Sequence, residues 1–115
     1  MTLETTKIAL FKGKQIRKTL YLNEWWFSVV DVIEALTESE RPSVYWTAMK
    51  ARVKAEGGFE LSTICRQLKL PAEDGKMRIT DCADTEGVFR IVQSIPSQKA
   101  EPFKRWLAKV GYERV

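Results

Sequence analysis

The stretch that decides the fold runs from Thr85 to Val115 and reads TEGVFRIVQSIPSQKAEPFKRWLAKVGYERV. It holds two apolar patterns with the i, i+3, i+4, i+7 spacing that places side chains on one face of a helix. Pro96 and Ser97 separate the patterns, and proline cannot donate the next helical hydrogen bond. We expect two amphipathic helices that build much of the core, the second ending at Gly111. The apolar positions are Val88, Ile91, Val92 and Ile95, followed by Phe103, Trp106, Leu107 and Val110.

The beginning of the chain predicts a β-meander. Strands are expected at Ile8–Phe11, Ile16–Leu22 and Trp25–Phe27, after an N-terminal segment without secondary structure. A glycine turn at Lys12–Lys14 joins the first two strands, and a turn at Asn23–Glu24 joins the next two, because asparagine tolerates positive φ.

Two helices are expected to follow the meander. Ser28 with Asp31 three residues later is typical of a helix start, and Val29, Val32, Ile33 and Leu36 share one face of that helix. Pro42 suits the first turn of the next helix, expected from about Ser43 to Ala55 and ended by Gly57-Gly58.

A hairpin is expected between the two pairs of helices, with strands at Ile64–Leu70 and Met77–Ala83 and a turn at Asp74-Gly75. If the hairpin is symmetric about Glu73-Asp74, Cys65 lies opposite Cys82; centring it on Asp74-Gly75 would separate them. The whole order predicts an α+β fold: an N-terminal antiparallel β-meander, two helices, a β-hairpin and two C-terminal amphipathic helices.

Composition narrows the class of protein. The chain has 115 residues, a net charge of +4, two cysteines and no histidine, so we expect one domain without histidine chemistry and with reduced thiols. No apolar run suits a membrane span and no secretory signal is visible, which favours the cytoplasm, in a bacterial cell or encoded by a phage. Nucleotide-binding loops are absent, so we expect no enzyme, no cofactor and no metal. Asp81, Asp84 and Glu86 leave carboxylate metal chemistry as a minor alternative to a helix N-terminus.

Basic residues fall into three groups that are candidate DNA contacts. A hairpin flanked by basic helices can follow a phosphate backbone or enter a groove, and arginine, glutamine and lysine are donor types used for base edges. The alternative is an ordinary charged surface. The groups are Lys50, Arg52 and Lys54; Arg66, Gln67, Lys69, Lys76 and Arg78; and Lys99, Lys104 and Arg105 together with Lys109.

Aromatic residues offer a second candidate surface. Trp25 and Trp26 point to opposite faces of a strand, so one of them is the better candidate for a partner contact. The helical spacing of Trp46, Phe103 and Trp106 favours core positions.

Two sets of residues resemble a known family. The run WFSVVDV at residues 26–32 is similar to a segment of the Bro-N domain, the N-terminal domain of BRO-family proteins and prophage antirepressors. The second set resembles a phage-derived bacterial branch of that family, some members of which are described as close to DNA-damage-inducible protein D. The resemblance spans about Lys7 to Arg114. The second set consists of RQLK at 66–69, DGK at 74–76, TD at 80–81 and QSIPSQKAEPFK at 93–104.

The resemblance implies a non-enzymatic DNA-binding domain of a phage or prophage regulator, acting on single- or double-stranded DNA. Such domains usually precede a variable C-terminal domain, so residues 1–115 are expected to be one Bro-N-like domain from the N-terminal part of a longer protein. The alternative is a protein-interaction module that binds a repressor or a host DNA-repair protein, and a homodimer is a further candidate assembly. The resemblance supplies no catalytic residues.

Overall fold

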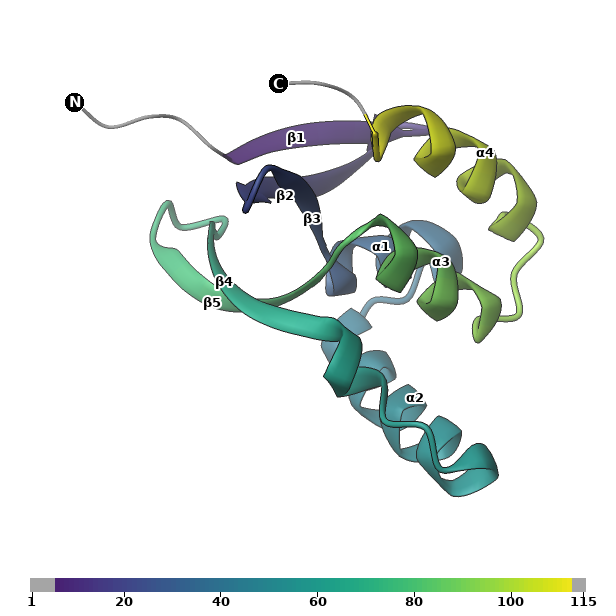
Figure 1. The fold of residues 1–115 in the computed structure, drawn as a ribbon. Helices are drawn as coiled ribbons and strands as arrows, with labels where there is room; N and C mark the ends of the chain where they lie inside the picture. The colour runs from purple at the N-terminus through teal and green to yellow at the C-terminus, as the bar shows by residue number, and fades with distance from the viewer. Residues whose placement is uncertain (1–5, 113–115) are drawn as a thin grey trace.

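The computed structural model describes residues 6–112, and Figure 1 shows the fold. The expected unstructured segment runs from Met1 to Thr6; residues 1–5 lie outside the described residues, as does Arg114 near the end of the family resemblance, and the prediction is wrong for Thr6. Thr6 begins the first strand. The elements are β1 (Thr6–Phe11), β2 (Lys14–Tyr21), β3 (Glu24–Ser28), α1 (Val29–Thr37), α2 (Pro42–Gly57), a 3₁₀ helix η1 (Leu61–Ile64), β4 (Cys65–Pro71), β5 (Met77–Ala83), α3 (Thr85–Gln93) and α4 (Ala100–Val110).

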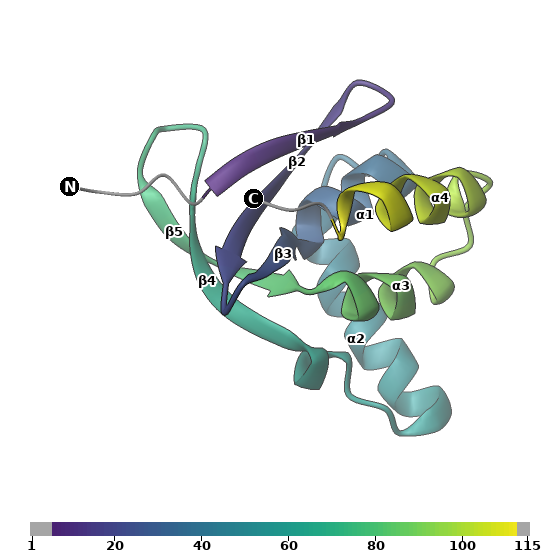
Figure 2. The same ribbon diagram turned by 45° about the horizontal axis from the view of Figure 1, so that its top comes forward.

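The five strands form one antiparallel sheet in the order β1-β2-β3-β5-β4. The first three strands make the expected meander, and β5 joins it through the pairs Phe27–Ala83 and Ser28–Cys82. The helices gather at one side of the sheet, with α1 and α3 between α4 and α2, whereas the β4–β5 turn points away from them (Figures 1 and 2). The α+β prediction is confirmed.

The meander turns are two-residue turns with positive φ at both central positions, as type I′ turns require. The first contains Lys12 (φ 49°) and Gly13 (φ 82°), and the second contains Leu22 (φ 53°) and Asn23 (φ 64°). The predicted turn at Asn23–Glu24 is therefore wrong by one residue, because Glu24 already pairs with Tyr21 in the sheet.

The helix boundaries follow the expected signals. The Ser28 hydroxyl accepts a hydrogen bond from the Asp31 backbone N–H (3.4 Å) at the start of α1. Pro42 occupies the first turn of α2, and Gly58 ends that helix with φ 75°. The Asp84 carboxylate caps α3 by accepting from the Gly87 N–H at 2.8 Å. Asp84 thus has a structural task at a helix N-terminus.

The hairpin register differs from both predicted alternatives. Cys65 lies opposite Ala83, and Arg66 lies opposite Cys82. The turn has three residues between Ala72 and Lys76, and Gly75 takes φ 81°, the arrangement of a type I turn followed by a left-handed residue. A three-residue turn centres the hairpin on Asp74 itself. Cys65 and Cys82 consequently point to opposite faces of the sheet.

The core forms around the two predicted apolar stripes. Val88, Ile91, Val92, Ile95, Phe103 and Leu107 are buried, and Trp106 and Val110 pack against them. The Phe11 ring meets the Phe103 ring edge to face, with centroids 4.9 Å apart, which fixes α4 on the end of β1. Among residues 6–112, none of the helices has both the length and the apolar character that a membrane span requires.

Candidate nucleic-acid interface

The two-stranded ribbon β4–β5 has two unlike faces, because side chains alternate along each strand. One face carries Leu68, Leu70 and Cys82, of which Leu70 and Cys82 are fully buried, and at its margins the exposed Arg66 and Arg78. The other face, which we call the outer face, carries Gln67, Lys69, Met77 and Ile79, and all four are exposed. The ribbon therefore packs inward through the middle of one face, and the outer end of the other face is free for a partner.

Arg17 on β2 fixes the inner side of the ribbon. Its guanidinium donates to the Pro71 carbonyl at the end of β4 (2.9 Å), to the Ser28 hydroxyl (3.3 Å) and to both carboxylate oxygens of Asp31 (2.8 and 2.9 Å). The hydrogen bond from Arg17 to Asp31 raises the pKa of the guanidinium, so the group stays charged at any working pH. One side chain thus joins β2, α1 and the ribbon.

Helix α2 covers the base of the outer face through Asp81. The Asp81 carboxylate accepts from Trp46 Nε1 (2.8 Å) and from Gln67 Nε2 (3.4 Å), and Lys50 Nζ lies 3.8 Å away. Lys50 also lies 5.0 Å above the Trp46 ring. This arrangement brings Lys50 and Gln67, from two of the predicted basic groups, beside each other.

The outer end of the ribbon stays uncovered. Lys69 and Lys76 have no ion-pair partner within residues 6–112. Arg78, by contrast, lies 2.6 Å from the Asp74 carboxylate in the turn. The Lys76 backbone N–H and the Arg78 side chain, in that order, lower the pKa of Asp74 by hydrogen bonding its charged form. Lys69 and Lys76 are the ribbon cations at this outer end that keep their charge available to a ligand; Arg66, at the other end, lies over the Tyr21 and Trp26 rings.

The other predicted basic residues are mostly engaged within the molecule. Lys54 pairs with Glu60 (2.9 Å), and Arg52 donates to the Ser94 carbonyl (2.8 Å). On α4 and the segment before it, Lys99 pairs with Glu38 (3.2 Å) and Lys104 pairs with Glu101 (3.3 Å), while Arg105 is exposed. Figure 1 shows α4 and α2 at opposite ends of the helical layer, so the α4 group does not join the surface formed by Lys50 and the ribbon.

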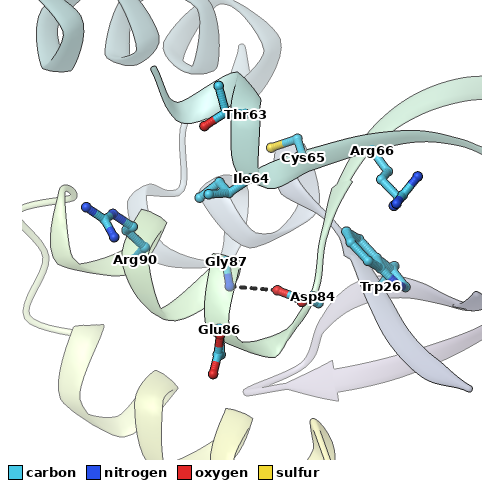
Figure 3. Close-up of a pocket in the computed structure, with 9 residues that line it drawn as sticks. All are labelled: Trp26, Thr63, Ile64, Cys65, Arg66, Asp84, Glu86, Gly87 and Arg90. Carbon is cyan, nitrogen blue, oxygen red and sulfur yellow. Dashed lines mark hydrogen bonds between the residues drawn. The ribbon is translucent and has the colours of Figure 1, made fainter. Parts of the chain in front are cut away.

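The two tryptophans of β3 have different surroundings. Trp25 belongs to the core, with Lys18 Nζ 4.2 Å from its ring centroid. Trp26 is half-buried and lines a cavity of about 440 Å³ at the point where the chain leaves β5 for α3 (Figure 3). Arg66 lies over Tyr21 (4.8 Å) and Trp26 (5.6 Å) at one end of this cavity. Trp26 is thus the tryptophan of this pair with surface open to a ligand.

The sequence did not identify Met77 and Ile79 as outward-facing residues of the site, because their orientation depends on the register of the hairpin. With the hairpin centred on Glu73-Asp74, Leu70 would face Met77 and Leu68 would face Ile79, giving one shared apolar face. The observed pairs are Lys69–Ile79 and Pro71–Met77. A shift of one residue moves side chains to the opposite face of a strand, so both residues point outward.

Fold and surface together define a small α+β domain that presents a two-stranded ribbon with lysines and a glutamine on its outer side. The model of the BRO family, N-terminal domain, matches residues 15–112, and the chain belongs to this family. Such domains are generally DNA-binding regulatory domains of phages and prophages and are not known enzymes, which supports a regulator-like role. Comparison with curated proteins and with solved structures gives no match.

Proposed function

We propose that the chain binds duplex DNA by placing the outer face of the β4–β5 ribbon in the major groove. The observation that carries the proposal is an outward ribbon face bearing Gln67 and Lys69, flanked by Lys50 and Lys76. The major groove is wide enough for a two-stranded ribbon, and glutamine and lysine are donors for adenine and guanine edges. Lys76 contacts a phosphate beside the turn, and Lys50, whose ammonium lies 3.8 Å from Asp81, exchanges that long ion pair for a phosphate at the base of the face.

A salt titration tests this function. Each phosphate contact contributes about 0.9 to the slope of log affinity against log salt concentration for B-form DNA. The double variant Lys69→Ala/Lys76→Ala should therefore bind a duplex more weakly at low salt and lower the magnitude of the slope by about one, because Lys76 is the phosphate contact of the two. Arg105→Ala removes a charge from α4, distant from the ribbon, and should leave the slope unchanged. Equal slopes for the two variants would overturn the ribbon as the contact surface.

Strand preference follows from the same geometry. A ribbon that reads a major groove needs a duplex, so we expect weaker binding to single-stranded DNA of the same length at equal salt. Gel shifts at two salt concentrations on both substrates measure the difference. Tighter binding to the single strand would instead favour stacking of bases, for which the half-buried Trp26 is the nearest candidate.

The finer biological role is that of an antirepressor-like transcription regulator. The family assignment and the DNA-contact surface support it, and a reporter repressed by a phage repressor tests it: expression of this chain should relieve repression. The Lys69→Ala/Lys76→Ala variant should then lose the effect together with DNA binding.

One observation favours a second function, the binding of a repressor, a DNA-repair protein or a second copy of the chain. The Trp26 cavity is lined by Ile64 and by Arg66 and Arg90, a mixture of apolar and charged groups suited to a peptide segment (Figure 3). Pull-down of a partner that survives charge reversal at Lys50, Lys69 and Lys76, none of which lines the cavity, would favour this function over DNA binding. Loss of the partner on Trp26→Ala would locate the contact at the cavity.

A further inference from the structure

The outer face of the ribbon carries two large apolar side chains where a solvent-facing strand is usually polar. Met77 is 55% exposed and Ile79 is 64% exposed. The inner face of the same ribbon already buries its own apolar set around Leu70 and Cys82. Met77 and Ile79 therefore do not contribute to the core, and folding alone gives no account of them.

Their outward position is fixed by the hairpin. The strands pair without interruption from Cys65–Ala83 to Pro71–Met77, and Lys69 lies opposite Ile79. A shift of one residue from the register set by the three-residue turn would move Leu70 into solvent. Arg17 holds the Pro71 carbonyl at 2.9 Å, which anchors the same end of the ribbon. The two side chains are thus presented on a rigid element.

The charges around these side chains indicate what covers them. Lys69 lies directly across from Ile79, and Lys76 precedes Met77 in the chain; neither lysine has an ion-pair partner within the described residues. An apolar pair between two available cations is complementary to a polyanion that also offers apolar groups. Duplex DNA does so in its major groove, where thymine exposes a C5-methyl group.

We propose that Met77 and Ile79 pack against thymine methyl groups in the major groove and give the domain a preference for A·T-containing sites. The inference rests on the proposed function and specifies what that surface recognises. Residues two apart on a strand are separated by about 6.8 Å, roughly two base-pair steps, so one ribbon strand lying along the groove meets two methyl groups. Each methyl group buried is worth about fourfold in affinity.

Replacing thymine by deoxyuridine tests the proposal, because it removes the methyl group and leaves pairing and the minor groove unchanged. The full chain should bind an alternating A·T duplex about fifteenfold more tightly than the matching A·U duplex. The variant Met77→Gln/Ile79→Thr should bind both duplexes equally, at the level of the unmodified chain on the A·U duplex. Because these contacts are apolar, the salt slope should not change.

Ile8→Thr is the matched control, since Ile8 is 55% exposed on β1 and receives the same substitution. It should keep the full preference for thymine. Introducing 5-methylcytosine into a G·C duplex should raise the affinity of the unmodified chain and not that of the double variant. Circular dichroism of each variant verifies the fold.

Two results would overturn the inference. Equal, salt-dependent binding of the unmodified chain to the thymine and uracil duplexes would overturn the contact with thymine methyl groups and leave the proposed DNA binding intact. A thymine preference that survives in Met77→Gln/Ile79→Thr would assign the methyl contact elsewhere. Absence of binding to every duplex at low salt would be a failure of the proposed function itself.

Discussion

Leu22 holds a backbone conformation that suits asparagine or glycine better than leucine. It takes φ 53° in the turn between β2 and β3, and its side chain is 75% exposed. The left-handed conformation costs an ordinary residue about 1–2 kcal/mol, and little burial offsets that cost here. The turn is therefore a place where the chain stores strain that a single substitution can release.

The variant Leu22→Asn should raise the free energy of unfolding by about 1 kcal/mol, because asparagine tolerates positive φ. Denaturant titration measures the change. Leu10→Asn is the matched control: Leu10 is also an exposed leucine, at 60%, but it lies within strand β1, where asparagine is disfavoured. A gain of equal size in both variants would show that reduced surface hydrophobicity, not relief of strain, is responsible.

Cys82 provides a prediction about pH. Burial raises the pKa of its thiol from 9.0 to about 12. Between these values the unfolded chain releases the proton and the folded chain keeps it. The contribution of this thiol to the free energy of unfolding is therefore fully present below pH 9 and is lost as pH rises toward 12. The slope owed to this thiol is about 1.4 kcal/mol per pH unit. Between pH 8 and 11 the free energy of unfolding should fall less steeply with pH in Cys82→Ala than in the unmodified chain. Parallel curves would contradict the raised pKa of Cys82.

At the scale of elements, the sequence predicts most of the fold because the signals are local. Ser28, Pro42, Gly58 and Asp84 begin or end helices through contacts within a few residues of themselves. The register of β4–β5 could not be predicted, because it depends on whether the turn has two residues or three. Asp74-Gly75 suits either turn length, and the choice decides which side chains face outward.

The junction of α3 and α4 depends on the absence of a side chain at Gly111. The Thr85 hydroxyl at the start of α3 donates to the Gly111 carbonyl (3.1 Å), and a Cβ at position 111 would lie 2.5 Å from that hydroxyl oxygen. Gly111→Ala should therefore destabilise the fold by about 1–3 kcal/mol, as overpacking does. Thermal unfolding checks this value. Gly57→Ala is the control, because open space surrounds Gly57 in α2, and it should be neutral or stabilising.

At the scale of the whole molecule, charge along the sequence is a weak guide to a binding surface. Three basic groups look equivalent in the sequence, yet folding pairs Lys54, Lys99 and Lys104 with nearby carboxylates and leaves Lys69 and Lys76 available. Lys104 and Glu101 are three residues apart in one helix, but the pairing of Lys99 with Glu38 joins residues that the local pattern does not connect. The outer face exists because tertiary packing decides which cations stay available to a partner.

Arg17 couples this surface to the rest of the molecule. Its guanidinium holds Asp31 and the Pro71 carbonyl at the same time, a geometry that the planar fork of arginine permits and the single amine of lysine does not. Arg17→Lys keeps the charge but should release the end of the ribbon. We expect unfolding to become easier by about 1–2 kcal/mol and DNA affinity to fall.

Amide hydrogen exchange separates this coupling from a general loss of stability. In Arg17→Lys, the amides of residues 69–79 should exchange faster than the rest of the sheet, because the loss is local to the ribbon. The salt slope of DNA binding should stay unchanged, since Arg17 makes no phosphate contact in the proposed complex. Arg90→Lys is the control: Arg90 lies 4.0 Å over the Phe59 ring, away from the ribbon turn, and should leave ribbon exchange unaltered. Unchanged exchange at residues 69–79 in Arg17→Lys would mean that packing of Leu70 alone holds the ribbon in place.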